Sequence, residues 1–173
     1  MSEWMMLTLV GEDRPGIVAA VTAALHEGGC YLGETSMIRL GGNFTIMMMV
    51  RCADVACNPQ MLLEPVVRSM GLRVHKDVID GHLHSHIEPN VRISVYGADR
   101  AGIVADVTRV LAQLGLNILG LESDVGGSDE KPIYILHIEG VVEQQVGVVE
   151  SALRDALGES IDVTVMPIDT CVG

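Results

Sequence analysis

Apolar residues follow two different periods along the chain, and the periods occur in the same order in each half. Continuous or alternating apolar runs predict strands, whereas apolar residues three and four positions apart predict helices. In the first half the patterns predict a strand over 4–10, a helix over 15–26, strands over 30–40 and 44–52, a helix over 59–70 and a strand over 72–79. In the second half they predict a strand over 91–96, a helix over 103–114, strands over 117–125 and 133–140, a helix over 146–157 and a strand over 161–167.

Glycine and proline mark where several of these elements should begin and end. Pro15 suits the first position of a helix, where its missing N–H costs nothing. Gly28 and Gly71 are expected to end the two helices of the first half, and residues 126–132 are expected to form a long loop between two strands. The strand over 44–52 is apolar on both faces, which indicates a central position in its sheet.

The order strand–helix–strand–strand–helix–strand predicts an α+β fold of two ferredoxin-like domains. Each domain would be a four-stranded antiparallel sheet with both helices on one face, the split βαβ arrangement. The expected domains are residues 1–80 and 91–173, with a linker over 81–90. The open face of each sheet is expected to be aliphatic and partly covered by pairing of the copies or by dimerisation, because exposed apolar surface costs about 25 cal/mol per Å².

The two halves also repeat each other residue by residue. Residues 11–22 return as residues 97–108, and ten of the fifteen positions from Gly11 to Leu25 are identical to those 86 positions later. Chance similarity does not explain such a match. The chain is therefore expected to contain two copies of one fold.

The repeated segment contains a turn that opens a helix, and this turn is the main candidate for chemistry. Its residues are Asp13, Arg14, Gly16 and Ile17 in the first copy and Asp99, Arg100, Gly102 and Ile103 in the second. A helix N-terminus offers unpaired N–H donors, and glycine lets a carboxylate approach them. The aspartates are placed to meet an ammonium, so an amino acid would fit. The alternative is structural: aspartate caps the helix and glycine permits the backbone angles.

These tandem copies and the Asp-Arg-Pro-Gly-Ile-Val turn resemble ACT domains, small regulatory modules that bind amino acids. The resemblance implies a ligand at an interface between two modules, in contact with the loop after the first strand and with a Gly-x-Asn-Ile segment at the start of the second strand. The second copy matches this segment with Gly115, Asn117 and Ile118, whereas the first copy has Tyr31 in place of the asparagine. The strand side of the ligand site is therefore expected from Asn117 and Ile118.

The charge of the chain bears on its partners. The formal net charge is −12, and no cluster of lysine and arginine is present. Direct binding of nucleic acid requires cations that neutralise phosphates, so nucleic acid and anionic membranes are not expected partners. A free-standing pair of such modules is similar to a family of transcriptional repressors that act through a DNA-binding activator protein. The resemblance implies that activator as partner, a small amino acid, with glycine as the guess, as effector, and a homo-oligomer.

The remaining features favour no enzyme activity and no cofactor. His82, His84 and His86 alternate in an extended segment and form a candidate metal site, against a solvated polar linker as the alternative. His137 is read as a satisfied core or edge histidine, and the four cysteines as small hydrophobic residues. The N-terminus has no basic head of a signal peptide, so a cytoplasmic location is expected. Two alternatives to transcriptional control stay open: a regulatory or interaction subunit of an amino-acid metabolic enzyme, and an interaction module without a ligand.

Overall fold

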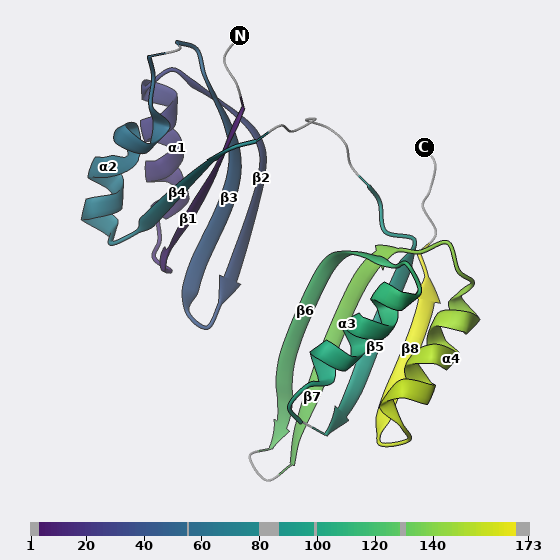
Figure 1. Ribbon diagram of the computed structural model, residues 1–173. Helices are drawn as coiled ribbons and strands as arrows, with labels where there is room; N and C mark the ends of the chain where they lie inside the picture. The colour runs from purple at the N-terminus through teal and green to yellow at the C-terminus, as the bar shows by residue number, and fades with distance from the viewer. Residues whose placement is uncertain (1–3, 55, 80–86, 99, 129–130, 169–173) are drawn as a thin grey trace. The chain divides into compact units, whose positions relative to one another are not determined.

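The computed structural model describes residues 4–54, 56–79, 87–98, 100–128 and 131–168. The chain divides into two compact units, residues 1–85 and 86–173, and each unit is described by itself (Figure 1). Most of the predicted linker, 81–90, lies outside the described residues, so its bounds stay a prediction.

The first unit has the predicted order of elements. They are β1 (Met5–Glu12), α1 (Ile17–Glu27), β2 (Cys30–Leu40), β3 (Asn43–Cys52), α2 (Pro59–Met70) and β4 (Arg73–Val78). The strands form an antiparallel sheet in the order β2-β3-β1-β4, and both helices lie on one face of it (Figure 1). The central position predicted for the strand over 44–52 is confirmed, because β3 pairs with both β1 and β2.

The second unit repeats this architecture. Its elements are β5 (Val91–Ala98), α3 (Ile103–Gln113), β6 (Asn117–Ser128), β7 (Lys131–Val141), α4 (Val146–Leu157) and β8 (Ile161–Pro167). The sheet order β6-β7-β5-β8 is equivalent to that of the first unit, and all pairs are antiparallel. The α+β fold of two ferredoxin-like domains is thus confirmed.

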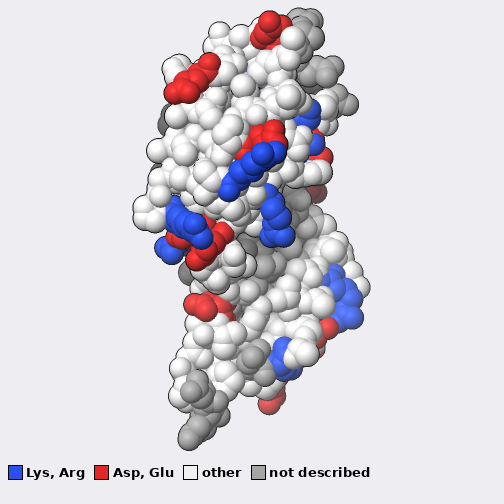
Figure 2. Space-filling model, turned by 90° about the vertical axis from the view of Figure 1, so that its left-hand side faces the viewer, with Lys and Arg blue, Asp and Glu red and all other residues white. Residues whose placement is uncertain are grey.

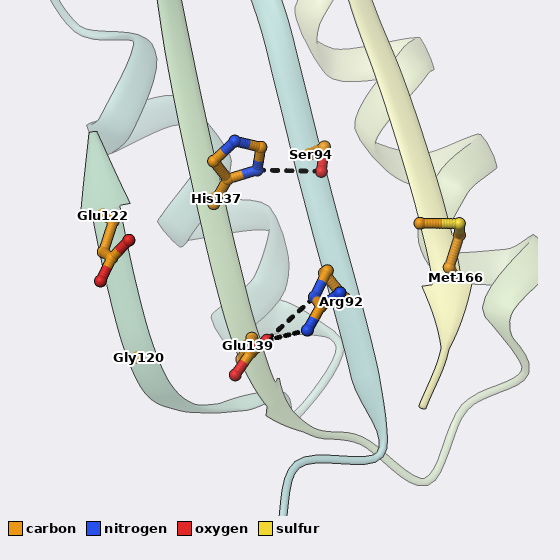
Figure 3. Close-up of a pocket in the computed structure, with 7 residues that line it drawn as sticks. All are labelled: Arg92, Ser94, Gly120, Glu122, His137, Glu139 and Met166. Atoms are coloured by element: carbon orange, nitrogen blue, oxygen red, sulfur yellow. Dashed lines mark hydrogen bonds and ion pairs between the residues drawn. The ribbon is translucent and has the colours of Figure 1, made fainter. Parts of the chain in front are cut away.

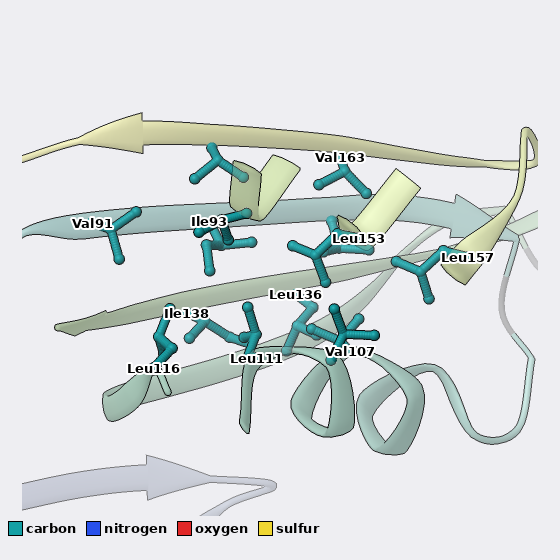
Figure 4. Packing of buried hydrophobic residues seen from close by; sticks show 14 of the residues in the cluster. Val91, Ile93, Val107, Leu111, Leu116, Leu136, Ile138, Leu153, Leu157 and Val163 are labelled. Carbon is teal, nitrogen blue, oxygen red and sulfur yellow. The ribbon is translucent and has the colours of Figure 1, made fainter. Parts of the chain in front are cut away.

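Each unit buries an aliphatic core between its sheet and its helices. In the second unit, Val107 and Leu111 of α3 and Leu153 of α4 pack over Ile93 and Leu136 of the sheet (Figure 4). All five side chains are fully buried. The helical spacing read from the sequence identified this stripe, because residues three and four apart share one face of a helix. Within the described part of the chain, no helix is long and apolar enough to span a membrane.

Two sequence expectations about element ends were wrong. Pro15 does not open α1; it precedes Gly16, which is the N-cap in a left-handed conformation, and the helix begins at Ile17. The loop expected over 126–132 is shorter, because residues 126–128 continue β6 and pair with residues 131–133 of β7. Antiparallel pairing holds this glycine-rich end of β6 in the ladder although glycine weakens strands.

Gly140 of β7 occupies a position where any side chain would collide. A Cβ atom there would lie 2.5 Å from the Asn117 carbonyl oxygen and 2.8 Å from Leu116 Cδ2. Gly140→Ala should therefore lower the free energy of unfolding of the second unit by about 1–3 kcal/mol, as overpacking does elsewhere. Gly120→Ala is the matched control, because a Cβ at Gly120 has nothing within 4 Å. Urea denaturation monitored by circular dichroism measures both; equal stability of the two variants would contradict the prediction.

Candidate functional site

The turn after β1 presents an uncapped helix start. Gly16 has φ 90°, and no side chain forms a capping hydrogen bond to α1. The first intrahelical hydrogen bond runs from Ala20 N to Gly16 O, so the N–H groups of the first turn have no partner within the helix. A Cβ built on Gly16 would meet nothing within 4 Å, which leaves the approach to the backbone open. The arrangement suits an anion.

A shallow hollow of about 370 Å³ lies in front of this helix start. Phe44 and Met37 form its apolar wall, and Asp13 and Arg14 its polar rim. The residues predicted for the first turn, Asp13, Arg14, Gly16 and Ile17, are thus brought together at one place. The hollow has room for a small zwitterion beside the helix start.

The charges of the first turn are already paired within the protein. Arg39 Nε lies 2.5 Å from Asp13 Oδ2, and Arg14 Nη2 lies 2.6 Å from Glu12 Oε2. The hydrogen bond from Arg14 lowers the pKa of the Glu12 carboxyl. The structural alternative, in which Asp13 caps α1, does not hold, because no side chain caps this helix. An ammonium group would have to share the Asp13 carboxylate with Arg39.

The second turn has the same backbone but different electrostatics. Gly102 is the N-cap with φ 91°, and again no side chain caps the helix. Arg100 Nη1 lies 3.2 Å from Asp106 Oδ2, and Arg109 Nη2 lies 2.5 Å from Asp106 Oδ1. The two arginines thus neutralise an acid that the first turn of α1 lacks. Asp99, the counterpart of Asp13, lies outside the described residues, as do His82, His84 and His86.

Asn117 and Ile118 lie at the far end of the second unit from its turn. Asn117 is exposed at the start of β6, and Ile118 packs against the core. Asn117 pairs with Val141 of β7, whereas Ala98, at the end of β5, pairs with Ile133. Eight residues of β7 separate these rungs, about 26 Å at about 3.3 Å per residue. The structure therefore does not bring Asn117 and Ile118 together with Gly102 and Ile103 within this unit.

The strands that carry the predicted ligand segment are long, exposed sheet edges. Among the strands that the structure describes, β2 pairs only with β3 and β6 only with β7. Each has a register shift near its start. Large apolar side chains on them are exposed; they are Tyr31, Leu32, Met37, Ile38 and Leu40 on β2 and Leu119, Leu121 and Val125 on β6. Open edges with apolar side chains favour pairing with another strand.

The open face of the second sheet holds a pocket that the sequence analysis missed. It encloses about 510 Å³, and its side chains come from all four strands (Figure 3). Ser94 Oγ lies 3.0 Å from His137 Nδ1, and Arg92 Nη2 lies 2.7 Å from Glu139 Oε1. His137 is exposed and hydrogen-bonded. The sequence does contain a signal for this pocket. Arg92 and Ser94 of β5, and His137 and Glu139 of β7, alternate with apolar residues and therefore share one face of the sheet.

This pocket does not form a hydrolytic site among the residues described. The Ser94–His137 hydrogen bond resembles a nucleophile and its base. Among the described residues, however, His137 has no hydrogen bond to a third group that would orient such a base. The backbone N–H groups of β5 and β7 lie within a strand ladder, which removes them as donors for an oxyanion. The pocket is a polar surface on which the Arg92–Glu139 ion pair is accompanied by a second carboxylate, Glu122.

The open face of the first sheet is different. Met6 and Met49 lie opposite each other there, beside Thr8 and Met47, and their alternation with buried residues places them away from the helices. The aliphatic open face expected from the sequence was therefore wrong for the second unit, where Arg92 and Glu139 replace the methionines. The two copies share a fold but not this surface.

Basic side chains do not gather into a patch on the surface that Figure 2 shows. Lysine and arginine lie there singly or in small groups, several of them next to acidic side chains. Four arginines are also paired with a carboxylate in the described part of the chain; they are Arg14, Arg39, Arg92 and Arg154. Paired cations do not supply the charge needed to bind phosphates.

Comparison with known proteins gives the family. Models described as ACT domain match residues 3–67 and 91–158. The chain belongs to the ACT-domain family. The glycine cleavage system transcriptional repressor of Escherichia coli K12 is 24% identical over 140 residues, which cover 79% of this chain and 72% of that protein. The UPF0237 protein YjhC of Lactococcus lactis is 35% identical over 71 residues, which cover 40% of this chain and 82% of that protein.

Solved structures agree with this ACT fold. An unknown protein from Galdieria sulphuraria superposes with a TM-score of 0.76 at 22% identity, covering 98% of this chain and 100% of its own. A protein assigned as a glycine cleavage system transcriptional repressor superposes with a TM-score of 0.72 at 19% identity, covering 98% and 99%. The ACT resemblance seen in the repeated turn is thus confirmed.

The left-handed glycines at the two helix starts give a testable consequence. Gly16→Ala and Gly102→Ala should each lower the free energy of unfolding by about 1–2 kcal/mol, because a Cβ is disfavoured at positive φ, although each site has open space around it. Gly147→Ala in α4 is the control, since its Cβ also meets nothing and alanine favours helix by about 0.5–1 kcal/mol. Urea unfolding of the three variants measures this; a neutral Gly16→Ala would contradict it.

Proposed function

We propose that the protein senses a small amino acid, glycine first, and controls transcription indirectly through a DNA-binding activator protein. The observation that carries the proposal is the pair of uncapped helix starts with an open backbone at Gly16 and Gly102. The similarity to the glycine cleavage system transcriptional repressor of Escherichia coli supports control of transcription, and the net charge of −12 supports an indirect mode. The ligand carboxylate would bind the helix N–H groups, where the dipole favours negative charge.

Other residues would contact the ligand's ammonium group and form the strand side of the site. Asp13 supplies a carboxylate in the first turn, shared with Arg39, whereas Arg100 of the second turn is paired with Asp106. Asn117 and Ile118 lie too far from the turn of their own unit to complete one site, so we propose that a second copy of the chain supplies them. Antiparallel pairing of exposed edge strands places the start of one strand beside the end of the other, which is the geometry that the two parts require.

Effector binding would act by population shift. An amino acid held between a turn and the edge strand of a second copy stabilises the paired state by its differential affinity for that state. The partner protein then recognises one state and not the other, and the coupling is reciprocal, so partner binding raises the affinity for the effector. Burial of the exposed apolar residues of β2 and β6 would stabilise the paired state even without the effector.

A calorimetric titration tests the effector site. Glycine should bind the wild-type chain with a saturable isotherm, and Asn117→Ala should weaken binding by about tenfold, which is a loss of about 1.4 kcal/mol. Tyr31→Ala is the matched control, because Tyr31 holds the equivalent position in the first copy and is exposed. Equal effects of the two substitutions would contradict the assignment of Asn117, and flat titrations with all twenty amino acids would overturn the effector.

The indirect mode makes a separate prediction. With a net charge of −12, the purified chain alone should leave promoter DNA unshifted in a gel even at low salt, where phosphate contacts are strongest. Addition of the chain to a preformed complex of activator and DNA should change the migration of that complex. A shift by the chain alone that weakens with salt would show direct binding and overturn the indirect mode.

A further inference from the structure

Three of the four cysteines converge at one end of the first unit. Cys30 is the first residue of β2, Cys52 is the last residue of β3, and the two are directly paired in the sheet. Cys57 joins them from the loop that leads into α2. Cys171 lies outside the described residues. The segments that supply the three thiols are therefore separate in sequence and meet only in the fold.

The separations of the sulfur atoms are those of a metal site. Cys30 Sγ lies 3.9 Å from Cys52 Sγ and 3.7 Å from Cys57 Sγ, and all three atoms lie within 4.8 Å of one another. A zinc ion with Zn–S bonds of about 2.3 Å holds the sulfurs of a tetrahedral site about 3.8 Å apart. The two separations from Cys30 bracket this value. The third pair, Cys52 and Cys57, lies within 4.8 Å, so a bound metal would draw these two sulfurs together by at most about 1 Å.

The loop before α2 holds Cys57 in place by its own hydrogen bonds. Cys57 N donates to the Asp54 carbonyl oxygen, and Ala56 N donates to Asp54 Oδ1 at 3.0 Å. Asn58 caps α2 by accepting a hydrogen bond from Gln60 N. Cys57 thus lies between its hydrogen bond to Asp54 on one side and the capped start of α2 on the other.

The second copy of the fold shows that the thiols are not needed for packing. Cys30 corresponds to Leu116 by the 86-residue repeat, and Cys52 corresponds to Val142 by the strand register. Leu116 and Val142 are both buried in the second core. Aliphatic side chains therefore serve at these positions, and the shorter connection of the second copy has no cysteine at all.

Disulfide chemistry fits the cluster less well than a metal. One disulfide would join only two of the three thiols, whereas a metal ion binds all three sulfur atoms at once. The ion deprotonates its thiol ligands as it binds.

We propose that Cys30, Cys52 and Cys57 form a binding site for one zinc(II) ion, independent of the amino-acid site. Each thiol releases its proton to solvent as its sulfur coordinates, and the fourth ligand is a water or a small solvent-borne ligand that enters past the half-buried Cys57. The ion links the ends of β2 and β3 to the start of α2. It lies at the end of the first sheet opposite the turn at Gly16, because Gly11 pairs with Phe44 and Cys30 with Cys52.

Metal titration of the full chain tests the site. The protein is purified without a histidine tag, reduced, stripped of metal and titrated with zinc against a chromogenic zinc chelator. One zinc per chain is expected, and cobalt(II) in its place should give thiolate-to-metal charge-transfer absorption. Zinc should also reduce the number of thiols that react with Ellman's reagent from four to one, a measurement that requires no variant.

Matched variants locate the ligands. Cys57→Ser, in a half-buried loop position, should abolish the cobalt charge-transfer absorption while circular dichroism shows an intact fold. Cys171→Ser, and a variant with His82, His84 and His86 all changed to alanine, should retain it. Absence of the absorption in the reduced wild-type chain, or its persistence in Cys57→Ser, would overturn the proposal. Glycine titration of Cys57→Ser separates the two sites, since it should match that of the wild type.

Discussion

The antiparallel register of each sheet is the constraint on which both candidate sites depend. The first strand of each unit is central, so the chain leaves it at one end of the sheet and, after a helix, enters the second strand at the other end. In the first unit Gly11 pairs with Phe44 and Tyr31 with Arg51. Every unit therefore has a turn end, with its uncapped helix start, and a strand-start end about a full strand length away. No rearrangement of side chains closes such a distance.

This geometry explains how duplication allowed the copies to diverge. The turn ends keep the same backbone, with φ 90° at Gly16 and 91° at Gly102, because the left-handed N-cap requires glycine in both. The strand-start ends carry no such backbone requirement. One holds Asn117 and a buried Leu116, whereas the other holds Tyr31 and the thiol of Cys30. The same freedom applies to the open faces of the sheets, where methionines line one copy and an Arg92–Glu139 ion pair crosses the other.

Local pattern made most of the fold predictable, and long-range pairing limited the rest. Helical spacing located the buried face of α3, and the glycines located the ends of α1 and α2. Pro15 misled because it was expected to be the first residue of the helix, whereas both Pro15 and the left-handed Gly16 precede it. The turn residues were found by their repetition, but the Asp13–Arg39 ion pair joins β2 to the turn across the sheet, and no spacing in the sequence indicates it. The thiol cluster was missed for the same reason, since Cys30 and Cys52 meet through strand pairing and Cys57 joins them from the loop before α2.

The two ends of the first unit also differ in what they can do to its stability. An amino acid at the turn would contact the N-terminus of α1 and one shallow hollow. It would therefore stabilise the contact with the second copy of the chain that completes the site. A metal at the strand-start end joins β2, β3 and the helix start of α2, all within one unit, and any ligand that binds only the folded state stabilises that state by mass action. With its proposed zinc bound, the first unit would serve as a rigid base, and the effector would act on the pairing of modules rather than on their folding. Such a separation of the two sites suits a sensor. The binding free energy of a small ligand is limited, and it has the largest effect where two states of similar stability compete.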